Sequence, residues 1–318
     1  MNEKLVTPFY IGDVKVNNRL VLAPMAGYTD CAMRTLCARS GAGLTVTEMV
    51  SAKGLLYCGQ KSAELLYTSP AETVKCAQIF GHEPNDFYKV LTETEYLNGF
   101  DIIDVNMGCP VPKIVKNGEG SSLIKDVIRA KEIVSACVDG AKGRPITVKT
   151  RMGFDEGEDC SISFCKEIES AGASAITLHA RTKAQGYAGK ADWSVIEKVK
   201  KELNVPLIGS GDVNEQNAEN LIEKCDALMI GRSAVGNPYI FARILEKEYN
   251  DDLTSVILEH IELMDEYYGE RYTYVNMRKF IGGYYGGMRG NKEIKQKCFS
   301  AQSVSKLKEI VQQIKNFL

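Results

Sequence analysis

The chain of 318 residues lacks the spacings that several common site types require. Its ten cysteines include no Cys-x-x-Cys pair, and the histidines are only His82, His179 and His260. A tetrahedral zinc cluster takes cysteine and histidine ligands, so we expect no metal centre. The cysteines are also too sparse for the disulfide framework of a small secreted domain, which favours a reducing compartment.

Long apolar runs and a strong net charge are also missing. No segment approaches the roughly 18 apolar residues of a transmembrane helix. The N-terminus has no apolar stretch followed by a small-residue cleavage site. The formal net charge is −2, so any surface for nucleic acid has to be local. We therefore expect a cytoplasmic protein without membrane contact.

Short apolar runs recur over residues 1–245, each followed by a longer stretch of helical periodicity. This alternation is typical of parallel strands joined by crossover helices. The expected strands are Leu20–Pro24, Gly43–Met49, Val74–Phe80, Asp101–Asn106, Ile146–Thr150, Ala175–His179, Leu207–Gly209 and Ala227–Ile230. Eight repeats fit an α/β fold with a closed (β/α)8 TIM barrel, which takes about 250 residues. We assign residues 1–245 to this barrel and expect the catalytic site in it.

Two flanking patterns support the barrel. A doubly wound sheet would need a glycine-rich phosphate turn after its first strand, but residues 22–27 read LAPMAG there. Residues 9–16 alternate around Gly12 and Asp13, which predicts a small hairpin at the barrel floor.

Charge separates along the last part of the chain, where the strand signals stop. Residues 246–270 carry a net charge of −8, and residues 271–318 carry +8 with aromatic side chains among the cations. A charge run is often only a solvated helix face. This mixture of cations and aromatic rings favours a surface for a phosphate backbone. We expect an all-α helical domain over 246–318, with Arg278 and Arg289 as candidate contacts.

Cys109 stands at the end of an apolar strand, between Gly108 and Pro110. Glycine permits unusual backbone angles and proline fixes φ, so the thiol is held on a turn. Buried cysteines usually act as small hydrophobes, so this motif alone leaves a core role and a chemical role equally open. The active site of a barrel lies at the C-terminal strand ends, which favours the chemical role.

Other polar residues also lie at the C-terminal ends of the expected strands. Lys149 ends the fifth strand, where it can form a Schiff base or offset negative charge on a reduced flavin. Gln78 offers a donor and an acceptor to the edge of a flavin or pyrimidine. His179 can do the same, although a satisfied core histidine is the routine alternative. The turns that contain Gly211 and Gly231 follow strands seven and eight, where barrels commonly bind phosphate.

Taken together, these motifs resemble the tRNA-dihydrouridine synthase family, in particular its bacterial B-like branch. Several long motifs in the expected order make the resemblance specific. They are LAPMAGYTD (22–30), TEMVSA (47–52), QIFG (78–81), DVNMGCP (104–110), VKTRMG (148–153), HART (179–182), GSGD (209–212) and GR with GNP (231–238). The helical tail matches by length and character rather than by motif.

The resemblance implies an FMN-containing barrel with a C-terminal helical domain that binds tRNA, and NAD(P)H as the electron source. The product is 5,6-dihydrouridine at particular uridines. Carried over to this chain, the flavin contacts are Pro24, Met25, Ala26, Gln78, Lys149, His179, Ser210, Gly211, Asp212, Gly231 and Arg232. Ser210 departs from the asparagine that the family often has.

Cys109 is implied to be the proton donor, with Asn106 toward the target base. A hydride at C6 needs a proton at C5 from the other face of the ring. An ordinary thiol has a pKa near ~8.5 and stays protonated at neutral pH. Arg181, Arg278 and Arg289 are further candidates for contacts with tRNA, and we expect a monomer.

Two other functions fit part of the pattern. A barrel reductase of a free pyrimidine or a related small molecule would use the same flavin residues but leave the basic tail without a role. A flavin-free RNA-binding protein would use the barrel as a scaffold. A comparison of product formation on tRNA and on free uracil distinguishes the small-molecule reductase from a tRNA-modifying enzyme. Uptake of FMN distinguishes a flavoenzyme from the flavin-free RNA-binding protein.

Overall fold

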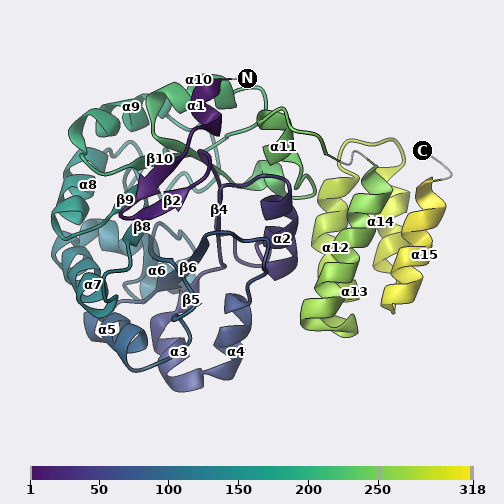
Figure 1. The fold of residues 1–318 in the computed structure, drawn as a ribbon, viewed down its shortest axis with the longest axis horizontal. Helices are drawn as coiled ribbons and strands as arrows, with labels where there is room; N and C mark the ends of the chain where they lie inside the picture. Colours follow the sequence, from purple (N-terminus) through teal and green to yellow (C-terminus); the bar gives the residue numbers. More distant parts are fainter. Residues whose placement is uncertain (1, 250–251, 316–318) are drawn as a thin grey trace.

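The computed structural model describes residues 2–249 and 252–315 (Figure 1). Its barrel strands are β3 (Leu20–Leu22), β4 (Leu44–Val46), β6 (Lys75–Phe80), β7 (Ile102–Met107), β8 (Ile146–Arg151), β9 (Ala175–His179), β10 (Leu207–Ser210) and β11 (Ala227–Ile230). All neighbours pair in parallel, and the β4–β6 pairing closes the cylinder. A short strand, β5 (Val50–Ser51), extends the edge of β6. The expected TIM barrel is confirmed.

An antiparallel hairpin closes the floor of the barrel, as the sequence predicts. Strands β1 (Phe9–Ile11) and β2 (Val14–Val16) pair around Gly12, which has φ +54°. Phe9, Ile11 and Val16 are buried against inward-facing residues of the barrel strands. The N-terminal end of the barrel is therefore packed with apolar side chains, and polar groups gather at the other end.

Helices surround the barrel and connect successive strands (Figure 1). They are α1 (Glu3–Val6), α2 (Cys31–Arg39), α3 (Ala52–Cys58), α4 (Gln60–Ala63), α5 (Pro84–Thr92), α6 (Pro112–Lys116), α7 (Val127–Gly140), α8 (Ser161–Ser170), α9 (Trp193–Glu202), α10 (Ala218–Leu221) and α11 (Ile240–Ile244). Short 3₁₀ turns lie at η1 (Glu64–Leu66), η2 (Gly120–Lys125), η3 (Ile222–Lys224) and η4 (Arg232–Ala234). Within the described ranges, no helix is long and apolar enough to span a membrane.

Four further helices form a bundle at one side of the barrel, drawn in green to yellow in Figure 1. They are α12 (Leu253–Tyr268), α13 (Glu270–Tyr284), α14 (Asn291–Phe299) and α15 (Val304–Lys315). Helix α12 packs against α2 of the barrel. The expected C-terminal helices are therefore present, while the domain boundary between residues 245 and 246 stays a prediction.

Two glycines bring the bundle into backbone contact with the barrel. A Cβ at Gly283 in α13 would lie 2.6 Å from the carbonyl oxygen of Val235. A Cβ at Gly236 would lie 2.3 Å from the carbonyl carbon of Gly283, and Gly236 has φ +71°. Only glycine fits both positions, so α13 lies directly on the segment that follows η4.

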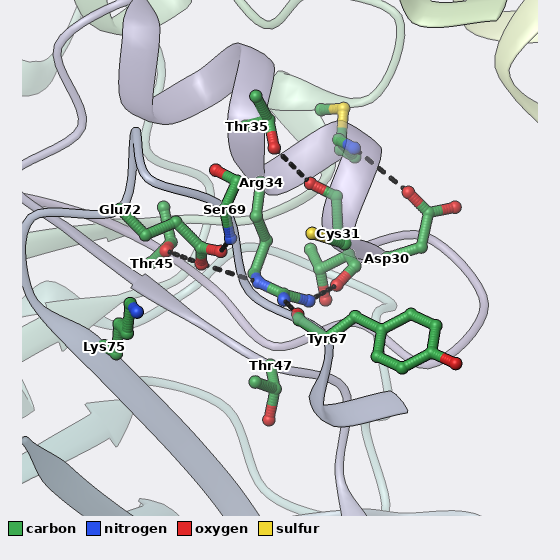
Figure 2. A network of polar contacts seen from close by, with 12 residues as sticks. Asp30, Cys31, Arg34, Thr35, Thr45, Thr47, Tyr67, Ser69, Glu72 and Lys75 are labelled. Atoms are coloured by element: carbon green, nitrogen blue, oxygen red, sulfur yellow. Dashed lines mark hydrogen bonds and ion pairs between the residues drawn. The ribbon is translucent and has the colours of Figure 1, made fainter. Parts of the chain in front are cut away.

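A buried ion pair lies behind the loop between β3 and α2. Arg34 Nε donates to Glu72 Oε2 at 2.9 Å, and both side chains are almost fully buried. The same guanidinium donates to the carbonyl oxygen of Thr29. It also donates to the carbonyl oxygen of Tyr67 (Figure 2). Breaking one side of such a pair costs about 3–5 kcal/mol because it leaves a buried charge unpaired. The pair therefore fixes a loop that forms part of the barrel mouth.

The glycine contact predicts a contrast between two adjacent substitutions in α13. Gly283→Ala should destabilise the protein by about 1–3 kcal/mol, because the added methyl meets backbone that cannot move aside. Gly282→Ala is the matched control: its Cβ would meet nothing within 4 Å, and alanine favours a helix by up to about 1 kcal/mol. Chemical denaturation measures both. Equal stability of the two variants would contradict the contact.

Candidate active site at the barrel mouth

A cavity of about 850 Å³ opens at the C-terminal ends of the barrel strands. All residues expected to contact a flavin line it, namely Pro24, Met25, Ala26, Gln78, Lys149, His179, Ser210, Gly211, Asp212, Gly231 and Arg232. Asn106 and Cys109 line it as well. The barrel thus brings together residues from most of its strands, although the role of each one stays a prediction.

Cys109 lies on the turn between β7 and α6, at the wall of the cavity. Its backbone N–H donates to Asn106 Oδ1 at 3.0 Å, and its carbonyl oxygen accepts from the Ser121 N–H at 3.1 Å. Burial raises the pKa of the thiol above its ordinary value. Cys109 is therefore a protonated thiol at neutral pH, held from both sides by hydrogen bonds to its backbone.

Lys149 stands beside Asn106 in the parallel register of β7 and β8. Among the described residues, its ammonium group has no hydrogen bond and no ion pair. Burial, followed by the nearby Arg151, lowers the pKa of Lys149 to about 8, although Asp104 and Cys109 act in the opposite direction. A partly buried cation without a partner is costly. Its position on the cavity wall therefore indicates an anionic or electron-rich ligand.

Arg151 is buried at the end of β8, where it connects two mouth loops. Its Nε donates to the carbonyl oxygen of Gly108 at 2.8 Å, next to Cys109. Its Nη1 donates to the carbonyl oxygens of Thr182 and Gly186, both at 2.9 Å. The Cys109 turn is thus tied to the loop of residues 180–192.

Arg181 connects that loop to the turn after β10. The side chain is only 1% exposed. Its Nη2 donates to Asp212 Oδ2 at 2.6 Å and to the Gly189 carbonyl oxygen at 2.7 Å. Its Nε donates to the Ala188 carbonyl oxygen at 3.1 Å. The guanidinium, expected to contact the substrate, faces the loop and Asp212 and does not line the cavity.

The turns after β10 and β11 form a cationic end of the cavity. Gly211 has φ +121°, and a Cβ there would lie 2.7 Å from that of Ala191, so the turn requires glycine. Arg232 is half-exposed, and its Nη2 reaches Asp212 Oδ1 at 3.2 Å. Burial opposes ionisation of Asp212, but hydrogen bonds and the charges of both arginines hold its pKa below the ordinary value.

His179 and Tyr187 lie between these cations. Burial, together with the positive charges around it, holds the pKa of His179 far below its ordinary value, so the ring is neutral. Its Nε2 lies 3.4 Å from Arg181 Nη1, which leaves Nδ1 as the protonated nitrogen. The Tyr187 ring lies 4.8 Å from the Arg232 guanidinium and 5.6 Å from that of Arg151. No sequence pattern marked Tyr187 as a cavity residue, because it lies in the middle of a loop and not at the end of a strand.

The cavity residues fit flavin mononucleotide. Met25, Ala26 and Met229 provide an apolar wall for a planar ring. The glycine turns and Arg232 offer donors to a terminal phosphate. The unpartnered Lys149 ammonium supplies a further cation to the cavity, from β8. In the part of the chain that the structure describes, no three histidine, cysteine or carboxylate side chains gather to hold a metal ion.

The other predicted substrate contacts lie outside the cavity. Arg278 is exposed on α13, and Arg289 is exposed in the segment that follows this helix. Helix α13 itself reaches the cavity wall through Gly283. Of the described bundle residues, only Gly283 of α13 lines the cavity, so this helix borders the mouth.

Comparison with known proteins identifies relatives along nearly the whole chain. Residues 21–318 match the model of the family described as Dihydrouridine synthase (Dus). A probable tRNA-dihydrouridine synthase of Rickettsia conorii is 36% identical over 301 residues, covering 90% of this chain and 89% of the relative. The tRNA-dihydrouridine synthase B of Vibrio vulnificus is 37% identical over 287 residues, covering 86% and 88%. Among solved structures, morphinone reductase shares the fold, with a TM-score of 0.58 and 15% identity over 80% of this chain and 93% of that one.

The depressed pKa of Lys149 predicts a pH-dependent gain in stability on its removal. The unfolded-state pKa is near the ordinary 10.5 and the folded-state value is about 8, so the charge destabilises the fold fully below pH 8. Lys149→Met should therefore stabilise the flavin-free protein at pH 7 by about 1 kcal/mol, roughly 2 °C in Tm. The gain should shrink as the pH rises from 8 to 10.5. A lower Tm for Lys149→Met at pH 7 would show that the Lys149 charge does not destabilise the fold.

Proposed function

The chain belongs to the dihydrouridine synthase family, and on this basis we propose that it is a tRNA-dihydrouridine synthase. This oxidoreductase reduces the C5–C6 double bond of particular uridines in tRNA, with NAD(P)H as the electron source. The observation that carries the proposal is that a protonated thiol, Cys109 on the turn after β7, and an unpartnered ammonium, Lys149 on the neighbouring β8, line one cavity.

The cofactor of this proposal is FMN. Pro24, Met25 and Ala26 would border its ring, and Gln78 and Lys149 would contact the ring edge. The residues on the ribityl-phosphate side of FMN would be His179, Ser210, Gly211, Asp212, Gly231 and Arg232. When bound and reduced, FMN supplies the hydride that C6 of the uracil receives.

Cys109 holds the proton that C5 receives. Because burial raises the pKa of the thiol, Sγ keeps its proton at neutral pH until carbon accepts it. The hydrogen bond to Asn106 Oδ1 and the Arg151 contact to Gly108 hold the turn in place. Lys149 offsets negative charge in the cavity from the neighbouring strand.

The tRNA has to present its uridine at the mouth of the barrel. A base within folded RNA is extruded at a cost of a few kcal/mol, which contacts with the phosphate backbone can offset. Exposed cations on and after α13, including Arg278 and Arg289, lie on the bundle that borders the mouth. We therefore assign the bundle to tRNA binding.

Cys109→Ala tests the proton donor. Dihydrouridine formation on unmodified tRNA, measured by mass spectrometry, should fall by a factor of about 10²–10⁴, the usual contribution of a general acid. Flavin content and reduction of the flavin by NADPH should stay unchanged, as should the activity of Cys58→Ala, a change at an exposed cysteine of α3. Full turnover by Cys109→Ala would remove the assignment. Turnover of free uracil without turnover of tRNA would favour a small-molecule reductase.

Salt dependence tests the assignment of the bundle. Affinity for tRNA should fall steeply with ionic strength. The double variant Arg278→Ala/Arg289→Ala should reduce the slope of log K against log salt by about 1 for each phosphate that the protein no longer neutralises. Lys201→Ala on α9, an exposed cation of the outer barrel, is the matched control and should leave the slope unchanged. A slope that is the same in all three proteins would contradict the assignment.

A further inference from the structure

A carboxylate lies buried beneath the cavity and has no place in the mechanism above. Asp104 is 4% exposed and sits in the middle of β7, two residues before Asn106 on the same inward face. Within the described ranges it forms no ion pair. Instead, Asp104 Oδ1 accepts from Thr147 Oγ1 at 2.6 Å, and Oδ2 accepts from Gln78 Nε2 at 2.6 Å. Asp104 thus links the strands on both sides of β7.

The contacts continue from Asp104 to the reactive thiol. Gln78 Oε1 accepts from Asn106 Nδ2 at 2.9 Å. Asn106 Oδ1 in turn accepts from the backbone N–H groups of Gly108 and Cys109, at 3.2 Å and 3.0 Å. A continuous chain of hydrogen bonds therefore runs from the barrel interior to the turn that carries Cys109.

The direction of every bond in this chain is set at its two ends. The backbone N–H of Cys109 can only donate, so Asn106 must present its oxygen to the turn and its nitrogen to Gln78. Gln78 must then accept through its oxygen, which leaves its nitrogen to donate to Asp104. Burial raises the pKa of Asp104, while the hydrogen bonds from Thr147 and Gln78 act in the opposite direction, and each carboxyl oxygen accepts one of these bonds. One orientation of the two amides satisfies all of these groups.

We propose that Asp104 is a positioning residue: it fixes the amide orientations of Gln78 and Asn106, and through Asn106 it holds the Cys109 turn. The buried carboxylate accepts at one end of these contacts and the backbone N–H groups of the turn donate at the other, so that rotation of either amide would set two donors or two acceptors against each other. Both amides line the cavity, and each keeps a second N–H that the chain of contacts does not use. Asp104 therefore also decides that the wall presents donors to a ligand. The catalytic consequence rests on the proposed function, whereas the effect on the turn does not.

Substitutions at Asp104 separate its acceptor role from its charge. Asp104→Leu removes the acceptor and should free both amides. Asp104→Asn can still accept from Gln78 if its own amide donates to the Thr147 hydroxyl, which can act as an acceptor. Thr147→Val leaves the carboxylate and its bond to Gln78 in place. The double variant Asp104→Asn/Thr147→Val also removes the Thr147 hydroxyl, which orients the new amide. The hydrogen bonds from residue 104 through Gln78 to Asn106 then no longer have one fixed direction.

The readout is the reactivity of Cys109 in the folded protein, which needs no turnover. Iodoacetamide alkylation of Cys109 is followed by peptide mapping, with the exposed Cys58 as internal reference. Loss of one hydrogen bond at the turn should speed alkylation by about fivefold. We expect this rise in Asp104→Leu and in the double variant, and changes below twofold in Asp104→Asn and Thr147→Val alone.

Asp104→Asn, Thr147→Val and their double variant form a double-mutant cycle, which tests the proposal even if Asp104→Leu fails to fold. Additive effects, or wild-type alkylation in the double variant, would overturn the proposal. In the tRNA assay, Asp104→Leu should lower kcat by about tenfold or more with little change in KM, and Asp104→Asn should recover most of that loss. Wild-type protein that alkylates as expected but does not modify tRNA would refute the proposed function and leave the role of Asp104 at the turn intact.

Discussion

Positive charge gathered at the barrel mouth is the constraint on which the rest of the site depends. Lys149, Arg151, Arg181 and Arg232 all act on His179 and lower its pKa. Each of the three guanidinium groups is offset by backbone carbonyl oxygens or by a carboxylate, so these cations also hold the loops together. Lys149 has no such partner among the described residues. The surplus charge leaves the cavity preorganised for an anionic ligand, because its donors are in place before that ligand arrives.

Cys109, Gly211 and Arg232 lie beyond the strand ends, on turns and loops, which are more mobile than the strands that carry them. A precise site therefore needs contacts that cross from one loop to the next. Arg151 joins the Cys109 turn to the 180–192 loop, and Arg34 fixes the β3–α2 loop from behind. The amide of Asn106 adds a contact from inside the barrel. Groups from separate strands can act in one cavity because these bonds fix their loops to one another.

The helical bundle is fixed to the same structure. Gly236 and Gly283 bring the backbone of α13 against the segment after η4, and Gly283 lines the cavity. At the end of α12, the Tyr268 hydroxyl accepts from the Cys31 N–H at 2.8 Å, at the start of α2. The proposed tRNA surface and the cavity therefore share one border. A base extruded from RNA held on the bundle would reach the mouth at this border.

The sequence by itself determined the barrel and most residues of its cavity, because apolar runs and strand-end motifs are local patterns that imply where strands stop. It also contained a signal for Asp104, an acid that alternates with Asn106 on one face of an apolar strand, but no local pattern names the partners of that acid. Only the tertiary structure decided that Arg181 faces Asp212 and not the cavity. It alone also placed Tyr187 between two arginines. Whether a side chain binds a ligand or holds a loop depends on partners far away in the chain, and their positions are set by folding.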